Sequence, residues 1–167
     1  AEAFERGFIS DASIAQSLDE RSNMWRTREN MSEVQRREGA SIKHDVSVPV
    51  AAVAEMISRG SDVAAKLVPG IRPCPFGHMG DGNIHFNFSP PVGANDAEFS
   101  ARAPDLHEAI YDIVLDLGGS VSAEHGIGQL KTELLKRVKD PVALAIMRKI
   151  KATLDPNGIM NPGKMLD

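Results

Sequence analysis

The chain has 167 residues, a length that suits one domain or a large part of one. Apolar residues make up 42% of it and the net charge is −4, so the composition is globular and offers no basic surface for nucleic acid. No apolar run approaches the roughly 20 residues of a membrane helix, and the single cysteine excludes an internal disulfide and favours a reducing compartment such as the cytoplasm.

The N-terminal part is predicted to hold a long helix, a short strand and a second helix. Residues 11–37 lack Gly and Pro and carry apolar residues at helical spacing, so we expect one helix that ends at Gly39. Residues 42–48 favour a short strand. Pro49 suits the first position of a helix that runs to about Leu67.

The central part is predicted to be a hairpin followed by a helix. Residues 71–78 and 83–89 favour two strands, and the Asp81-Gly82 pair between them is typical of a two-residue hairpin turn. Asn95 matches the first position of a capping box. The helix that it opens is expected to end at the pair of glycines that follows.

The C-terminal part is predicted to be mostly helical. A short extended stretch over residues 120–123 precedes helices over 127–138 and 141–154, the second capped by Asp140, and a turn-rich tail follows. A very short turn joins strands in an antiparallel pair. We therefore predict an α+β fold in one domain over residues 1–167, with an antiparallel sheet, helices packed on one face and further C-terminal helices.

The predicted hairpin carries two histidines. With Asp-Gly as the loop, His78 faces His85, and directly opposed residues share a face of the sheet. Asn83, His85 and Asn87 alternate with apolar residues, so this face is polar. Two imidazoles placed in this way can chelate one metal ion. The alternative is a half-exposed hairpin with two ordinary surface histidines.

A second polar segment spans residues 122–128. Glu124 can complete a site of two His and one carboxylate that leaves room for a substrate on the metal. His125 is a candidate general base because imidazole titrates near neutrality. Neighbouring strand residues point to opposite faces, so both side chains reach one site only from an irregular backbone, which Gly126 and Gly128 permit. The alternative is a glycine-containing turn that leads into a helix.

A third polar segment lies in the first helix. Arg28 and Ser32 are four residues apart and are expected to share a helix face. The planar guanidinium of Arg suits a carboxylate, to which it donates two parallel hydrogen bonds. Lys43 and Asp45 share one face of the strand that follows. The alternative is a solvated, charged helix.

Taken together and in this order, these segments resemble the C-terminal domain of FAD-linked oxidases. This group includes D-lactate dehydrogenase, D-2-hydroxyglutarate dehydrogenase and the flavin subunit of glycolate oxidase. The matching segments span nearly the whole chain and are residues 25–29, 43–49, 77–87, 122–128 and 155–165. The resemblance implies an enzyme that uses FAD to oxidise a D-2-hydroxy acid to a 2-oxo acid.

The resemblance also implies roles for the polar residues of the hairpin and of the second segment. His78, His85 and Glu124 match positions that bind a divalent metal, often zinc, in the metal-using members of the family. His125 matches the base that removes the proton of the substrate hydroxyl.

Further positions match substrate and flavin contacts. Arg28, Ser32 and Lys43 match residues that hold the substrate carboxylates in hydroxyglutarate-type members, and Asn87 is assigned to the substrate with them. Asn161, in the C-terminal tail, is expected near the flavin.

Family members carry an N-terminal flavin-binding domain of the vanillyl-alcohol oxidase type, and no Gly-rich flavin-binding segment is visible here. We therefore expect a fragment that is inactive by itself, with the FAD domain, a 2-hydroxy acid and an electron acceptor as partners, and with homo-oligomerisation left open. Two other classes remain at this point. A metallohydrolase would need no flavin, and a non-catalytic interaction module would need no metal.

Overall fold

A computed structural model describes residues 2–78 and 80–166, apart from the side chains of Ser32 and Arg36. The chain divides into two compact units, Ala1–Gly39 and Ala40–Asp167. None of the described helices has the length and apolarity needed to cross a bilayer.

The first unit is helical. Its elements are α1 (Glu2–Glu5), α2 (Leu18–Glu29), α3 (Met31–Gln35) and the short 3₁₀ helix η1 (Arg36–Glu38). Ser17 starts α2 because its hydroxyl accepts the N–H of Glu20 at 3.1 Å, while the Glu20 carboxylate accepts the N–H of Gln16 at 2.7 Å.

The prediction of one helix over residues 11–37 is wrong in its start and in its continuity. The helix starts late because Ser17 caps it, and it is interrupted at Asn30. The Asn30 N–H closes α2 on the Arg26 carbonyl at 3.0 Å, and its own carbonyl accepts the N–H of Val34 at 2.9 Å, which opens α3. Arg28 therefore lies in α2 and Ser32 in α3, and the Ser32 side chain lies outside the described part of the chain.

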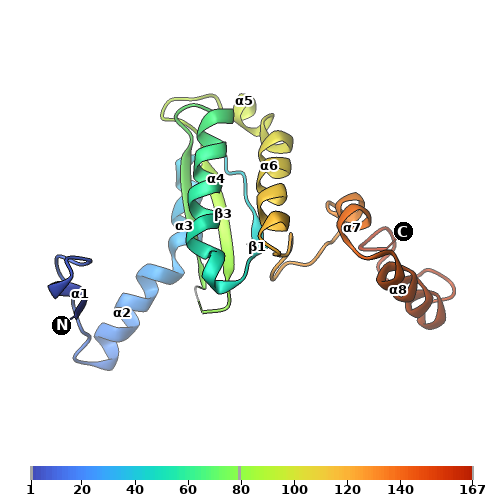
Figure 1. The fold of residues 1–167 in the computed structure, drawn as a ribbon, viewed down its shortest axis with the longest axis horizontal. Helices are drawn as coiled ribbons and strands as arrows, with labels where there is room; N and C mark the ends of the chain where they lie inside the picture. Colours follow the sequence, from blue (N-terminus) through green and yellow to red (C-terminus); the bar gives the residue numbers. More distant parts are fainter. Residues whose placement is uncertain (1, 79, 167) are drawn as a thin grey trace. The chain divides into compact units, whose positions relative to one another are not determined.

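The second unit is built on a three-stranded antiparallel sheet. Its strands are β1 (Asp45–Ser47), β2 (Arg72–His78) and β3 (Asn83–Ser89), in the order β1-β3-β2 (Figure 1). Ile42 extends the β1 side of the sheet, because it exchanges two backbone hydrogen bonds of 3.1 and 2.8 Å with Phe88. The predicted α+β class is confirmed.

Helices α4 and α6 lie side by side over one face of this sheet (Figure 1). The helical elements of the second unit are η2 (Val50–Ala52), α4 (Val53–Leu67), α5 (Asp96–Ser100), α6 (Ala103–Asp116), α7 (Thr132–Val138) and α8 (Pro141–Leu154). The predicted caps are confirmed, since Asn95 accepts the N–H of Ala97 at 2.8 Å and Asp140 accepts that of Ala143 at 2.9 Å. The helix expected after Asn95 is divided into α5 and α6, and Pro104 occupies the first turn of α6.

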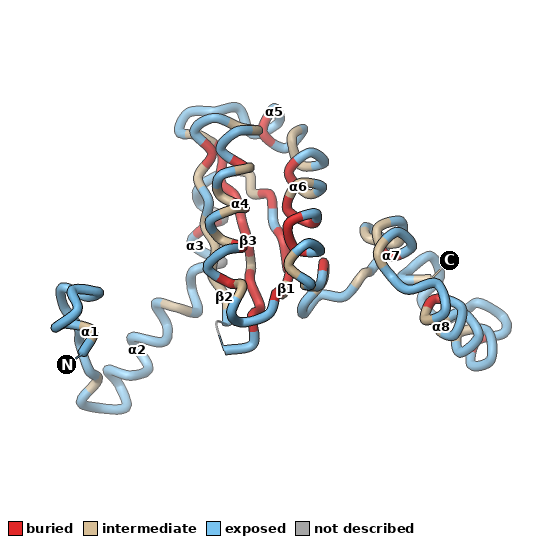
Figure 2. Tube along the Cα trace, viewed as in Figure 1, coloured by how far each residue is buried: buried red, intermediate tan, exposed pale blue. Residues whose placement is uncertain are grey.

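The core lies between the sheet and the two helices (Figure 2). Phe86 and Phe88 of β3 are fully buried there, together with Met56 of α4 and Leu106 of α6. Gly60 lets α4 approach the sheet, because an added Cβ would lie 2.8 Å from Cζ of Phe86. The alternation of β3 then turns its polar residues toward the opposite face.

The β2–β3 hairpin has a different register from the predicted one. His78 lies opposite Asn83, and Phe76 lies opposite His85. The predicted direct pairing of His78 with His85 is therefore wrong. Because the register moves by two residues and not by one, the two histidines still share a face, as diagonal neighbours.

The reason for this register is a loop that is longer than two residues. The N–H groups of Asp81 and Gly82 both donate to the His78 carbonyl, at 3.3 and 3.1 Å. The Asp81 carboxylate accepts the N–H of Asn83 at 3.0 Å. These bonds end the strand pairing at His78, where a two-residue turn would have continued it.

Candidate active site

The segment that follows α6 lies next to the polar face of β1 and β3. Ser120 and Ser47 exchange backbone hydrogen bonds of 2.8 and 3.0 Å, which attach this segment to β1. Gly119 is required at the contact because an added Cβ would lie 2.2 Å from the Ser47 carbonyl oxygen. The attachment brings Glu124 and His125 to the polar face of the sheet.

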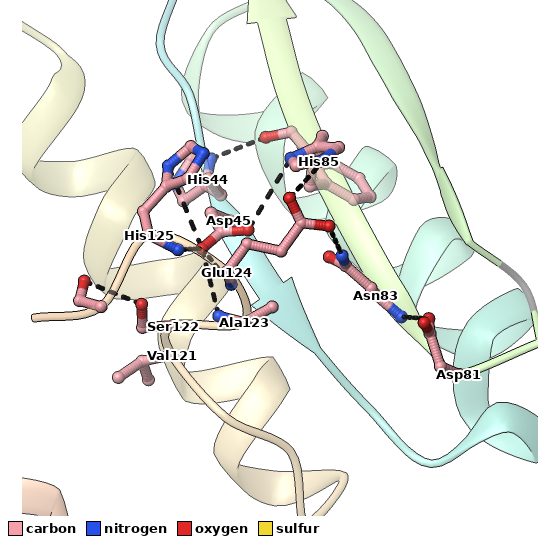
Figure 3. Close-up of polar contacts among 12 residues, drawn as sticks. His44, Asp45, Asp81, Asn83, His85, Val121, Ser122, Ala123, Glu124 and His125 are labelled. Atoms are coloured by element: carbon pink, nitrogen blue, oxygen red, sulfur yellow. Dashed lines mark hydrogen bonds and ion pairs between the residues drawn. The ribbon is translucent and has the colours of Figure 1, made fainter.

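Asp45 holds the backbone of that segment (Figure 3). Its Oδ2 accepts three consecutive N–H groups, from Ala123 at 3.1 Å, Glu124 at 2.9 Å and His125 at 2.8 Å. Residues 123–125 form a bend and not a strand. The expectation of an irregular backbone is confirmed, and both side chains reach the same site.

The Asp45 carboxylate is buried and charged. Burial by itself raises the pKa of this carboxyl group. The N–H groups of His125 and Glu124, the charge of His125 and the N–H of Ala123 outweigh that effect, so the pKa of Asp45 lies below its ordinary value. A negative charge is therefore fixed at the floor of the site.

His85 lies between two carboxylates (Figure 3). Its Nδ1 is 3.8 Å from Oδ1 of Asp45, and its Nε2 is 3.9 Å from Oε2 of Glu124. The other oxygen of Glu124 accepts a hydrogen bond from the side-chain amide of Asn83. This contact orients the Glu124 carboxylate toward the sheet.

His125 lies at the open side of the cluster. Its ring centroid is 6.1 Å from that of His85, and its Nδ1 is 4.0 Å from Oδ2 of Asp45. The side chain is 71% exposed, so a small molecule can reach the ring. Adjacent charge and an accessible imidazole are the features that proton transfer requires.

The donor set of this cluster fits a divalent metal ion. Among the described residues, one ligand atom each of Asp45, Glu124 and His125 lies within 4.8 Å of the other two. The buried Oδ1 atom of Asn83 has no hydrogen-bond partner among the described residues, and such an atom calls for a further group. Imidazole nitrogen and carboxylate oxygen are ligands that zinc accepts.

His78 is less closely associated with the cluster than the sequence predicts. It is 54% exposed, and its Nδ1 lies 3.8 Å from Oδ2 of Asp81. The register explains this position, since His85 has Phe76 opposite it, with ring centroids 5.2 Å apart.

Lys43 lines a cavity of about 430 Å³. The rest of the lining comes from α6, from α7 and from the two residues before α7, namely His107, Glu108, Tyr111, Leu130, Lys131, Glu133, Leu134 and Arg137. Burial, followed by the charge of Asp45, raises the pKa of Tyr111 in this lining. Lys43 precedes β1, and the cavity into which it opens was not predictable from the sequence.

His107, to which no role was assigned from the sequence, is half-buried and pairs with the buried ring of His44. The Nδ1 of His107 lies 2.9 Å from Nε2 of His44, and Nδ1 of His44 lies 2.8 Å from the Phe86 carbonyl oxygen. His44 Nδ1 therefore donates to the carbonyl, and His44 Nε2 accepts from His107. A lone histidine in a helix gives no sequence signal for such a pair.

The other predicted site residues are distributed over the chain. Asn87 is buried on the polar face of β3. Arg28 and Ser32 belong to the first unit. Asn161 is exposed in the tail with φ of 47°, and the tail returns to the site segment through a 2.8 Å hydrogen bond from the Met165 N–H to the Gly128 carbonyl.

Comparisons with known proteins identify relatives and a family for the chain. A D-2-hydroxyglutarate dehydrogenase of Stutzerimonas stutzeri is 34% identical over 161 residues, which cover 96% of this chain and 34% of the relative. The mitochondrial D-2-hydroxyglutarate dehydrogenase of Arabidopsis thaliana is 36% identical, with 98% and 28% covered, and that of Bos taurus is 34% identical, with 99% and 29% covered. The chain thus spans about a third of the length of these relatives. The family model of the C-terminal domain of FAD-linked oxidases matches residues 1–165, so the chain belongs to that family.

Proposed function

We propose that this chain is the substrate-side domain of a flavin-dependent dehydrogenase that oxidises a D-2-hydroxy acid to a 2-oxo acid. The observation that carries the proposal is the convergence of His85, Glu124 and His125 around the Asp45 carboxylate. The names of the relatives make D-2-hydroxyglutarate the first candidate substrate. The family argues against the metallohydrolase alternative.

His125 is the proposed base. Its backbone N–H is held by Asp45, its ring is exposed, and its Nδ1 lies 4.0 Å from the same carboxylate. When the ring takes the proton of the substrate hydroxyl, the negative charge of Asp45 stabilises the imidazolium that forms. The FAD, when bound, supplies the acceptor for the hydride that leaves the neighbouring carbon.

His85 and Glu124 are proposed to hold a divalent metal, with zinc as the first candidate. His78 shares their face of the sheet and is the proposed third ligand. The metal, when bound, would polarise the substrate hydroxyl and lower its pKa. Asn83 keeps Glu124 turned toward His85 by its amide hydrogen bond.

Substrate carboxylates are proposed to bind to Lys43 and Asn87. For Arg28 and Ser32, carboxylate binding stays a prediction that rests on the family resemblance. Lys43 supports this part of the proposal, because it is exposed, lines the cavity and stands two residues before Asp45 in the chain. A fixed cation next to the site converts binding energy into alignment of the reacting carbon.

The partner is proposed to be an FAD-binding domain that covers α8 and the tail. Four apolar side chains repeat every four residues along α8 and remain more than half exposed, namely Val142, Ile146, Ile150 and Leu154. Such a stripe is typical of a helix that packs against another surface. Asn161, in the tail that follows, is the proposed contact to the flavin.

Steady-state reduction of a dye acceptor tests the proposed function. The gene product that contains this chain, purified with its flavin, should oxidise D-2-hydroxyglutarate and should discriminate against the L-enantiomer. The 167-residue chain alone, with FAD added, is the matched control and should reduce no dye, because the proposed partner domain supplies most of the contacts to FAD. Activity of the chain alone on esters or amides, with no oxidation of any 2-hydroxy acid by the gene product, would contradict the proposal.

A further inference from the structure

The two oxygens of the Asp45 carboxylate have different surroundings. Oδ2 accepts the N–H groups of Ala123, Glu124 and His125. Oδ1 faces Nδ1 of His85 at 3.8 Å, and no other donor among the described residues bonds to it. The side chain is only 5% exposed. A buried carboxylate oxygen needs a hydrogen-bond donor, and the His85 ring is placed to provide one.

Glu124 competes for the same imidazole proton. A neutral imidazole carries a hydrogen on one nitrogen and a lone pair on the other, and Nε2 of His85 lies 3.9 Å from Oε2 of Glu124. The Glu124 side chain is 47% exposed, so water can hydrate it, and its other oxygen already accepts from Asn83. Water reaches the buried Asp45 oxygen far less easily. The Nδ1–H tautomer of His85, which points its proton toward Asp45, is therefore more stable than the Nε2–H tautomer.

We propose that Asp45 is a positioning residue that fixes His85 as the Nδ1–H tautomer, so that the Nε2 lone pair faces Glu124. A histidine in this state can offer Nε2 to a cation while a carboxylate holds its other nitrogen, an arrangement typical of metal-binding histidines. The same carboxylate fixes the backbone of Glu124 and His125 through Oδ2. Asp45 thereby sets the tautomer of His85 through Oδ1 and the conformation of the Glu124–His125 backbone through Oδ2. The metal part rests on the proposed function, whereas the tautomer does not.

Asp45→Asn is the sharpest test because it keeps the shape of the side chain. Three N–H donors converge on the Oδ2 position, so the new amide should place its oxygen there and its NH₂ group toward His85. An NH₂ group is a donor, which requires Nδ1 of His85 to accept. The variant should therefore reverse the tautomer of His85 without releasing the loop.

Long-range proton–nitrogen correlation spectra of the full, metal-free chain, at mildly alkaline pH, report which nitrogen of each imidazole is protonated. Resonances of His85 are assigned from their loss in His85→Gln. We expect Nδ1–H in the wild type and Nε2–H in Asp45→Asn, with slow exchange of the Glu124 and His125 amides in both. Val46→Ala removes a buried neighbour of Asp45 and is the matched destabilised control, which should keep the wild-type tautomer.

The outcomes separate cleanly. Nε2–H in the wild type, or an unchanged tautomer in a folded Asp45→Asn variant, overturns the proposal, and the wild-type spectrum decides alone if the variant does not fold. Zn²⁺ titration should then show affinity about 10- to 100-fold weaker in Asp45→Asn than in Val46→Ala; equal affinities would show that the tautomer does not serve the metal. If the tautomer reverses and the gene product oxidises no hydroxy acid, Asp45 keeps this role and the proposed function fails.

Discussion

His44 makes the stability of the second unit depend on pH. Its buried ring donates to the Phe86 carbonyl and accepts from His107. Burial, followed by the charge of His107, lowers the pKa of His44 from its ordinary value of 6.5 to about 3. The unfolded chain takes up this proton below about pH 6.5, while the folded chain does not. The contribution of His44 to the free energy of unfolding is therefore fully present above that pH and is lost as the pH falls toward 3.

Urea unfolding should show this dependence before the carboxylates titrate. Between pH 7.5 and pH 5 we expect a loss of about 2 kcal/mol, since each pH unit below the unfolded pKa costs about 1.4 kcal/mol. His44→Gln cannot take up the proton, so it should be less stable at pH 7.5 and should show a smaller loss between the two pH values. Equal losses in both proteins would show that His44 is not the group responsible.

Several site residues could be predicted from the sequence, and others could not. The glycines that follow His125 indicate an irregular backbone locally, so its convergence with Glu124 was predictable. The central position of Asp45 could not be predicted from the sequence, because it depends on three N–H groups of a loop that is distant in the sequence. The cavity beside Lys43 depends in the same way on α6 and α7.

At the scale of elements, Gly82 holds the β2–β3 loop against Val48, the residue that follows β1. The Gly82 carbonyl accepts the N–H of Val48 at 3.0 Å. Its φ is +75°, and an added Cβ would lie 1.9 Å from the Val48 carbonyl oxygen. Both the conformation and the space therefore require glycine here.

Gly82→Ala should destabilise the chain by about 2 kcal/mol or more, from backbone strain and the clash with the Val48 carbonyl. Gly80→Ala is the matched control in the same loop, since an added Cβ meets no atom within 4 Å and the backbone is not left-handed. Thermal unfolding of both variants checks this. A Gly82→Ala protein as stable as the Gly80→Ala protein would contradict the described contact between the loop and Val48.

The helix caps could be predicted from neighbouring residues alone. The length of the β2–β3 loop could not, because two local preferences compete there. Asn95 and Asp140 cap their helices as expected, because a cap needs only its own next few residues. Asp81-Gly82 favoured a two-residue turn, but the Asp81 side chain bonds to the Asn83 N–H and lengthens the loop. The interruption at Asn30 was missed because apolar spacing continues across it.

At the scale of the whole molecule, the chain belongs to a family in which the relatives are about three times its length. The α+β class followed from the sequence because short connections restrict strand pairing. The exposure of the apolar stripe of α8 could not be predicted from the sequence, because the same spacing is typical of a helix that packs inside its own domain. The proposed FAD-binding domain gives that stripe a partner.

The cluster around Asp45 is proposed to remove the hydroxyl proton as hydride passes to FAD, and anaerobic rapid mixing tests this proposal most directly. The gene product with oxidised flavin is mixed with D-2-hydroxyglutarate, and the flavin absorbance is followed in one turnover. We predict bleaching in the wild type that slows by about 10²- to 10⁴-fold in His125→Ala, because a general base contributes on that order. Equal bleaching rates in the two proteins would contradict the account.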